Sequence, residues 1–137
     1  MKKFSRVAFS KAILRRFSAL ASEFSLRRTS GVFSYEFVDR YTGDDLLLSV
    51  FLAHPELPHI TIAPLNTEQV FHYAPAPASP AGKLKKRYYR ELGESEDPSA
   101  KTAALFSDFA DVQVDAVRSA LDAVRRRRRP GRDWKGK

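Results

Sequence analysis

The chain has 137 residues, of which 43% are hydrophobic, and a formal net charge of +8 at pH 7. That length suits a single domain, and the apolar content is enough for a core, so a wholly disordered chain is excluded. There is no cysteine, which excludes disulfides and thiolate metal sites. No apolar run approaches the roughly 20 residues of a membrane-spanning helix, so no transmembrane segment is predicted.

Residues 3–28 are predicted to form an amphipathic helix that Gly31 ends. Apolar side chains from Phe4 to Phe24 recur at helical spacing, and most arginines lie off that stripe. The segment is rich in Arg and Ser and almost free of acids, as in a mitochondrial presequence, and residues 15–18 resemble a matrix-peptidase cleavage site. Three interpretations stay open. The first is an import signal for the mitochondrial matrix, and the second is a first helix that supplies core residues of a cytoplasmic or nuclear protein. The third is a helix on a membrane surface, because its basic face would suit anionic lipid.

Four short strands are predicted next. Residues 32–38 alternate between apolar and polar side chains, which is typical of a half-buried antiparallel strand. A polar hairpin loop follows, and residues 46–53 are then apolar on both faces, as in a central strand. Residues 59–63 form the third strand, whose two isoleucines are predicted to face inward. The fourth strand, residues 69–73, is predicted to lie at the edge of the sheet.

A linker and a second helix follow the strands. Residues 74–82 contain three prolines, which favour an extended linker, and the charged residues up to Asp97 continue it. The final helix is expected to start near Pro98, with Asp97 as its cap. Its apolar stripe reaches Val124.

Together these elements predict an α+β fold. We expect an antiparallel sheet of three to four strands, with the N- and C-terminal helices packed on one face in the order α-β-β-β-β-α. Residues 1–124 form one predicted domain, in which 74–97 is a proline-rich and then charged linker. Residues 125–137 form a basic tail whose removal is expected to leave the domain folded. The predicted core residues are Phe37, Leu48, Ile62, Phe109 and Leu121.

The basic tail is the first candidate nucleic-acid site. Residues 125–137 hold eight Lys and Arg against one acid. Guanidinium groups pair with phosphate, and a ring among them can stack on an exposed base. The alternatives are a solvated helix end, a localisation signal or a contact with an acidic protein. The predicted site residues are Arg125, Arg126, Arg127, Arg128, Arg129, Arg132, Trp134 and Lys135.

A second basic run lies at residues 83–90, where five Lys and Arg are interleaved with two tyrosines. Such a run suits a groove that follows a nucleic-acid backbone and offers rings for stacking. The alternative is a loop whose charges neutralise the acidic residues 91–97. The predicted site residues are Lys83, Lys85, Lys86, Arg87, Tyr88, Tyr89 and Arg90.

Motifs for catalysis or metal binding are lacking. There is no glycine-rich phosphate loop, nucleophile elbow or paired-acid motif, so no enzyme, cofactor or metal is predicted. His54 and His59 flank Glu56, but the neighbouring prolines exclude the helix of a zincin motif. Four aspartates share one face of the final helix, where a solvated face or pairing with arginines of the first helix is favoured over metal binding. They are Asp108, Asp111, Asp115 and Asp122.

The segment Arg28–Val32, with the sequence RTSGV, joins the predicted first helix to a strand. It resembles the corresponding junction in the small Alu-domain subunit of the signal recognition particle. The resemblance implies an α-β-β-β-α fold with basic extensions and binding to RNA. It covers about a dozen residues. The long basic loop of that family lies between its first two strands, whereas here the basic run follows the sheet.

Three functions are weighed. The favoured one is a small non-enzymatic protein that binds RNA or another polyanion as a subunit of a ribonucleoprotein such as a ribosome, with a mitochondrial version fitting the first helix. The second is an adaptor or inhibitory subunit of a larger protein assembly. The third is a small basic ribonuclease in which His54, His59 or His72 supplies acid–base catalysis near a bound phosphate.

Overall fold

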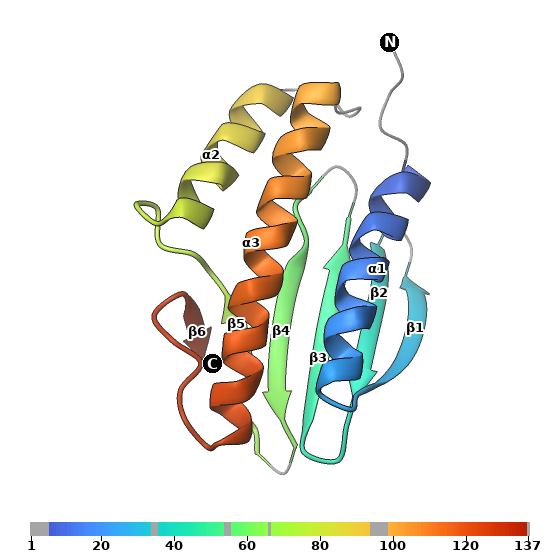
Figure 1. Cartoon of the computed structure of the whole chain (residues 1–137), viewed down its shortest axis with the longest axis vertical. Helices are drawn as coiled ribbons and strands as arrows, with labels where there is room; N and C mark the ends of the chain where they lie inside the picture. The colour runs from blue at the N-terminus through green and yellow to red at the C-terminus, as the bar shows by residue number, and fades with distance from the viewer. Residues whose placement is uncertain (1–5, 34–35, 54–55, 66, 94–98, 137) are drawn as a thin grey trace.

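The structure, a computed structural model, describes residues 6–33, 36–53, 56–65, 67–93 and 99–136. The fold is α+β, as predicted, and the described chain forms three helices and one six-stranded antiparallel sheet. In Figure 1, α1 and α3 lie in front of the sheet and α2 lies beside α3. The elements are α1 (Arg6–Glu23), β1 (Arg27–Phe33), β2 (Glu36–Thr42), β3 (Leu46–Leu52), β4 (His59–Pro64), β5 (Phe71–Tyr73), α2 (Pro80–Leu92), α3 (Ala100–Arg125) and β6 (Trp134–Gly136).

The strands lie in sequence order from β1 to β6, and every neighbouring pair is antiparallel. The predicted strands 46–53 and 59–63 are confirmed as β3 and β4. The prediction of three to four strands is too low, because the region of the first predicted strand forms two strands, β1 and β2, and residues 134–136 also join the sheet. Residues 69–73 supply β5, which is not an edge strand because β6 pairs with it.

The N-terminal helix ends earlier than its apolar pattern predicts. Ser25 adopts a φ of +57°, and the Leu26 N–H donates to the Ala21 carbonyl at 2.9 Å. This left-handed turn closes the last helical turn and stops the helix at Glu23. Leu26 is buried, so its side chain holds the turn against the core.

This early end corrects three predictions. The helix does not continue to residue 28, Gly31 does not stop a helix, and the predicted strand 32–38 is divided between β1 and β2. The junction Arg28–Val32, on which the resemblance to the signal recognition particle subunit depends, lies inside β1. The observed fold therefore does not support that resemblance.

One face of the sheet packs against the helices and forms the core. In β3, Leu48 and Val50 point toward the helices and are fully buried, whereas Leu47 and Phe51 point to the other face and are partly exposed. None of the described helices covers that other face. The predicted core residue Phe37 lies outside the side chains that the structure describes. The other four, Leu48, Ile62, Phe109 and Leu121, are buried as predicted.

The first helix supplies part of this core. Ile13, Phe17 and Leu20 recur at helical spacing and are at most 1% exposed. Cleavage within residues 15–18 would remove Ile13 from the folded chain. The described part of α1 therefore fits the interpretation as a first helix of the domain.

Residues 80–92, predicted as linker and loop, form α2 instead. Ser79 caps the helix, because its Oγ accepts the Gly82 N–H at 3.0 Å, and Pro80 occupies the first turn. A Cβ at Gly82 would collide with the Ala76 carbonyl, so the helix start packs tightly on the preceding segment. The prolines that suggest a linker thus include one that starts a helix. The connection between β5 and α2 is limited to residues 74–79 and ends in a turn, in which the Ser79 N–H donates to the Ala76 carbonyl at 2.9 Å.

The long helix α3 crosses the sheet beside α1. Ser99 caps its first turn, and the predicted cap Asp97 and start Pro98 lie outside the described residues. Its apolar stripe is interrupted by the fully buried Gln113, whose Nε2 donates to the Pro58 carbonyl at 2.9 Å. This bond ties α3 to the turn before β4. No helix in the described ranges combines the length and apolarity needed to cross a bilayer.

Candidate nucleic-acid interface

Residues 126–133 connect α3 to β6, and we call this segment the arginine loop. Two backbone hydrogen bonds close the end of α3 where the loop begins. The Arg127 N–H donates to the Val124 carbonyl, and the Arg128 N–H donates to the Ala123 carbonyl. This turn gives Arg127 a φ of +60°, a conformation that glycine normally supplies. A side chain there costs about 1–2 kcal/mol of backbone strain. The chain therefore keeps a cation where the backbone favours glycine.

The far end of the loop is anchored on the domain. The Asp133 carboxylate accepts the Ala76 N–H at 3.1 Å. Trp134 is 8% exposed and packs on Tyr73, with ring centroids 5.2 Å apart. The prediction that residues 125–137 form a basic tail outside the domain is therefore corrected. Trp134–Gly136 belong to the sheet, because β6 pairs with β5 and the indole is buried.

Two of the six arginines between residues 125 and 132 form ion pairs within the domain. Arg125 donates through Nε and Nη2 to the two carboxylate oxygens of Asp45, at 2.7 and 3.1 Å, and through Nη2 to the Phe24 carbonyl. Arg126 pairs with Asp122 at 3.3 Å. Both predicted contact residues already have acidic partners, so we leave them out of the candidate interface.

We expect Asp45 to stabilise the fold in its ionised form only. The hydrogen bond from Arg125 holds the pKa of Asp45 below its ordinary value of 3.8, partly opposed by desolvation. Because folding lowers this pKa, the stabilisation is present above 3.8 and is lost as the pH falls through the lower value of the folded state. Both side chains of the pair are more than a third exposed, so Asp45→Asn should cost no more than about 1 kcal/mol at pH 7.

Urea unfolding of the parent and the Asp45→Asn variant checks this expectation at pH 7 and well below pH 3.8. The free energies of unfolding of the two proteins should differ at pH 7 and become equal in acid. Asp44→Asn is the control, because Asp44 is exposed and has no ion pair with a described residue. A difference that persists in acid would mean that the carboxylate charge of Asp45 is not what matters.

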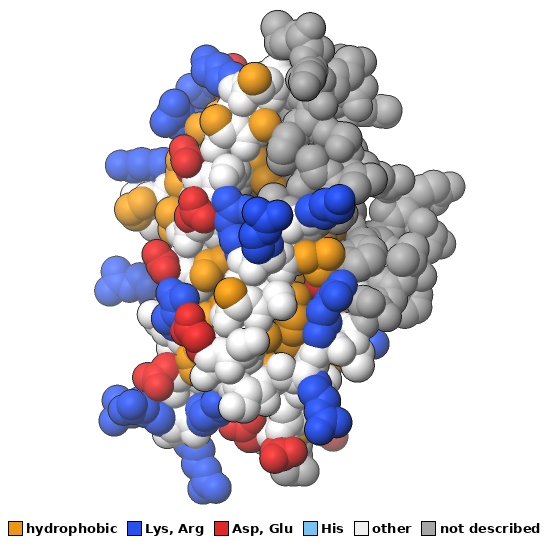
Figure 2. Space-filling view, turned by 45° about the vertical axis from the view of Figure 1, so that its right-hand side comes forward, with side chains coloured by type: hydrophobic (Ala, Val, Ile, Leu, Met, Phe, Trp, Pro, Cys, Tyr) orange, Lys and Arg blue, Asp and Glu red, His pale blue; other side chains and the backbone are white. Residues whose placement is uncertain are grey.

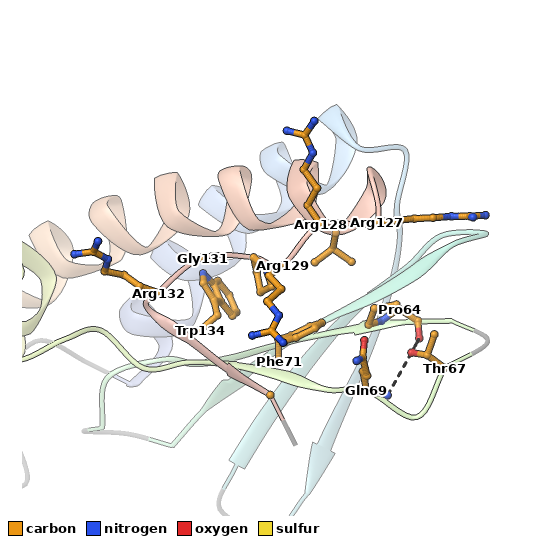
Figure 3. Close-up of a pocket in the computed structure, with 13 residues that line it drawn as sticks. Pro64, Thr67, Gln69, Phe71, Arg127, Arg128, Arg129, Gly131, Arg132 and Trp134 are labelled. Atoms are coloured by element: carbon orange, nitrogen blue, oxygen red, sulfur yellow. Dashed lines mark hydrogen bonds between the residues drawn. The ribbon is translucent and has the colours of Figure 1, made fainter.

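The remaining four arginines line one cavity of about 870 Å³ between the arginine loop and the hairpin that joins β4 to β5. None of the four pairs with an acid within the part of the chain that the structure describes. In Figure 3, Arg129 points toward Phe71, whereas Arg127 and Arg128 point outward from the loop. The four residues are Arg127, Arg128, Arg129 and Arg132.

The β4–β5 hairpin supplies the other wall of the cavity. The Thr67 hydroxyl donates to the Pro64 carbonyl at 3.1 Å and accepts the Gln69 N–H at 3.3 Å, which orders this corner. Phe71 adds a partly buried ring, and no acidic side chain lines the cavity among the described residues. No pattern in the sequence indicates this wall, because only the register of β5 with β6, which pairs Phe71 with Gly136, brings the β4–β5 hairpin to the arginines.

The second predicted basic run lies on the outer side of α2. Its five Lys and Arg are exposed, and none has an ion pair with a described residue. Figure 1 shows α2 and the arginine loop on the same side of the molecule. The five residues are Lys83, Lys85, Lys86, Arg87 and Arg90.

The aromatic residues predicted to stack on bases have other roles. Tyr88 is fully buried, which raises the pKa of its hydroxyl, and Trp134 is buried in β6. Tyr89 accepts the Leu57 N–H at 3.1 Å and donates to Glu56 at 2.7 Å. Burial raises the pKa of Tyr89 to about 12, so its hydroxyl stays protonated as this donation requires. The prediction that Tyr88 and Trp134 stack on bases therefore does not fit the structure, since neither residue offers a free ring face.

The last predicted site residue, Lys135, is exposed on β6 and lies opposite His72 in the register of the sheet. His59 and His72 are neighbours on the open face, where Nε2 of His59 and Nδ1 of His72 share a hydrogen bond of 3.2 Å. His54 lies outside the described residues. The two described candidates for acid–base catalysis thus lie on the face opposite the helices and do not line the arginine cavity.

Three of the four acidic residues of α3 pair with arginines among the described residues: Asp111, Asp115 and Asp122. Arg16 of α1 donates to Asp111 at 2.7 Å, so the predicted pairing with an arginine of the first helix is observed for this one aspartate. Arg118 donates to both Glu23 and Asp115. Figure 2 shows acidic and basic side chains close together on this helical side. Within the described ranges, no three potential metal ligands form a group.

The cavity thus offers positive charge, guanidinium donors, a few neutral polar groups and one partly buried ring. Such a surface can bind an anion but brings no acid–base pair to it among the described residues. The chain matches no protein-family model, no curated protein and no solved structure. Its function is therefore inferred from the chemistry of this surface.

Proposed function

We propose that the protein is a non-enzymatic RNA-binding protein whose arginine loop makes the main contact with phosphate. The observation that carries the proposal is the group of four arginines around one cavity, none of them neutralised by an acid among the described residues. Guanidinium groups donate paired hydrogen bonds that match the oxygens of a phosphate. The strained backbone at Arg127 supports a functional role, since strained positions cluster at binding sites.

The spread of the arginines favours an extended polyanion over a single small anion. A site for one phosphate would direct its donors to one point, whereas Arg127 and Arg128 point outward and Arg129 points toward Phe71 (Figure 3). A chain of phosphates can contact several such cations at once and release counterions at each contact. The exposed cations of α2, on the same side of the molecule, offer a second contact to the same chain (Figure 1).

A salt titration of RNA binding tests the proposal. The variant carries Gln at Arg127, Arg128, Arg129 and Arg132. Each lost phosphate contact should reduce the slope of log K against log salt by about 0.7 on single-stranded RNA, so the variant should be flatter by up to about 3. The matched control removes the same number of charges from α2, with Gln at Lys83, Lys85, Lys86 and Arg87.

The loop variant should lose more affinity and more slope than the α2 control, and it should do so for all RNA sequences alike. Equal losses in the two variants would indicate attraction by net charge alone. Equal slopes and affinities in the parent and the loop variant would contradict the proposal and favour an adaptor that binds an acidic protein surface.

A further inference from the structure

The open face of the sheet carries a row of three rings. The register places Phe51 of β3 opposite His59 of β4, and His72 of β5 follows across the sheet. The ring centroids are 5.7 Å apart between Phe51 and His59 and 5.3 Å apart between His59 and His72. The hydrogen bond between the two imidazoles holds them side by side. His59 is exposed and Phe51 and His72 are partly exposed, while Nε2 of His72 is buried, so the row is partly accessible from solvent.

Two exposed cations share the face with the row. Arg40 on β2 and Lys135 on β6 are exposed on the same face, and no carboxylate is found among the described outward side chains of the strands. Glu56 lies at one end of the row, where it lines a small cavity with Phe51 and His59. Its carboxylate accepts the hydroxyl of Tyr89 at 2.7 Å, which orients it within the domain.

We infer that this face binds the bases of single-stranded RNA, with Phe51, His59 and His72 as a stacking platform. The inference rests on the proposed function and adds a second, base-contacting surface to it. Neighbouring rings on an open sheet suit unstacked bases, because every base presents a flat π-face whatever its sequence. Lys135 is exposed on β6, opposite His72, and β6 follows the arginine loop directly in the chain, so one cation lies between the two surfaces.

Charge decides between RNA and a second copy of the chain as the occupant. A second copy would place Arg40 and Lys135 against the same cations of its partner, and like charges oppose such an interface. An RNA strand brings negative phosphates to these cations and bases to the rings. The face therefore complements a single strand better than it complements itself.

Two probes separate stacking from phosphate contacts: a single-stranded oligoadenylate, and an abasic oligomer with the same number of phosphates. The parent should bind the oligoadenylate more tightly. Phe51→Leu keeps an apolar side chain but removes the ring, and it should weaken oligoadenylate binding about 5- to 150-fold while leaving abasic binding and the salt slope unchanged. Thr42→Val, on the same face away from the row, is the control and should change neither.

The arginine-loop variant should weaken both probes and keep the ratio between them, so the two proposals fail separately. Equal binding of both probes by the parent, or an unchanged ratio in Phe51→Leu, would overturn the stacking platform and leave the arginine loop standing. A second readout needs no variant. Imidazole C–H resonances of His59 and His72 should shift with oligoadenylate and not with the abasic oligomer. Association of the free protein that Phe51→Leu abolishes would assign the face to a second copy instead.

Discussion

Trp134→Ala is expected to lower the free energy of unfolding by about 3–5 kcal/mol, as for other buried aromatic residues. The indole is 8% exposed and packs on Tyr73 at the edge of the core. Without it, β6 would keep three residues and its hydrogen bonds to β5, too little to hold a strand at the edge. A loss of this size would unfold a marginally stable domain.

Urea unfolding followed by circular dichroism measures the effect. Lys135→Ala is the matched control, because it changes the next residue of the same strand but removes only an exposed side chain, and it should stay within about 0.5 kcal/mol of the parent. Deletion of residues 126–137 should lower the free energy of unfolding at least as much as Trp134→Ala does. From the sequence alone, this deletion is expected to leave the domain folded. If Trp134→Ala unfolds like Lys135→Ala, β6 contributes nothing to the fold.

Tyr88→Ala is also expected to cost about 3–5 kcal/mol, because it opens a cavity where α2 meets α3. The ring is fully buried and lies 5.9 Å from that of Phe106 and 5.2 Å from that of Tyr89. The substitution should therefore weaken RNA binding only through unfolding. The loss should disappear when affinity is measured at a temperature where the variant is folded.

Arg87→Ala is the control for Tyr88→Ala, since it removes the preceding, exposed side chain from the same helix. It should leave the melting temperature almost unchanged and reduce RNA affinity slightly. Two results would restore Tyr88 as a stacking residue: an unchanged melting temperature together with lower RNA affinity in Tyr88→Ala.

The elements that could be predicted from the sequence are those with strong periodicity. Residues 46–53 and 59–63 alternate or remain apolar as buried strands do, and both strands are observed. The polar segment 27–33 resembles a helix end and forms β1 only because Ser25 turns the chain at residue 25. The three residues of β6 carry too little pattern to be recognised, and the apolar contact of Trp134 with Tyr73 decides their place.

The candidate site was predictable in part. The basic run in the sequence shows where cations are concentrated, but it does not show which of them form ion pairs with acids of the same domain. Arg125 is neutralised by Asp45, 80 residues earlier in the sequence, and only the tertiary fold brings the two together. The sequence indicates only one member of the ring row. The inward isoleucines of β4 imply that His59 points outward. That Phe51 and His72 lie next to His59 depends on the strand register, which the sequence does not show.

The buried position of Trp134 makes the indole a built-in optical probe. It is the only tryptophan of the chain, so all tryptophan emission comes from one site at the edge of the sheet. The same residue lines the arginine cavity together with Phe71 and Arg129. Emission at short wavelength reports that the last strand is docked, and a red shift reports its release. Quenching without a red shift then distinguishes a ligand in the cavity from loss of the strand, in one cuvette and without a label.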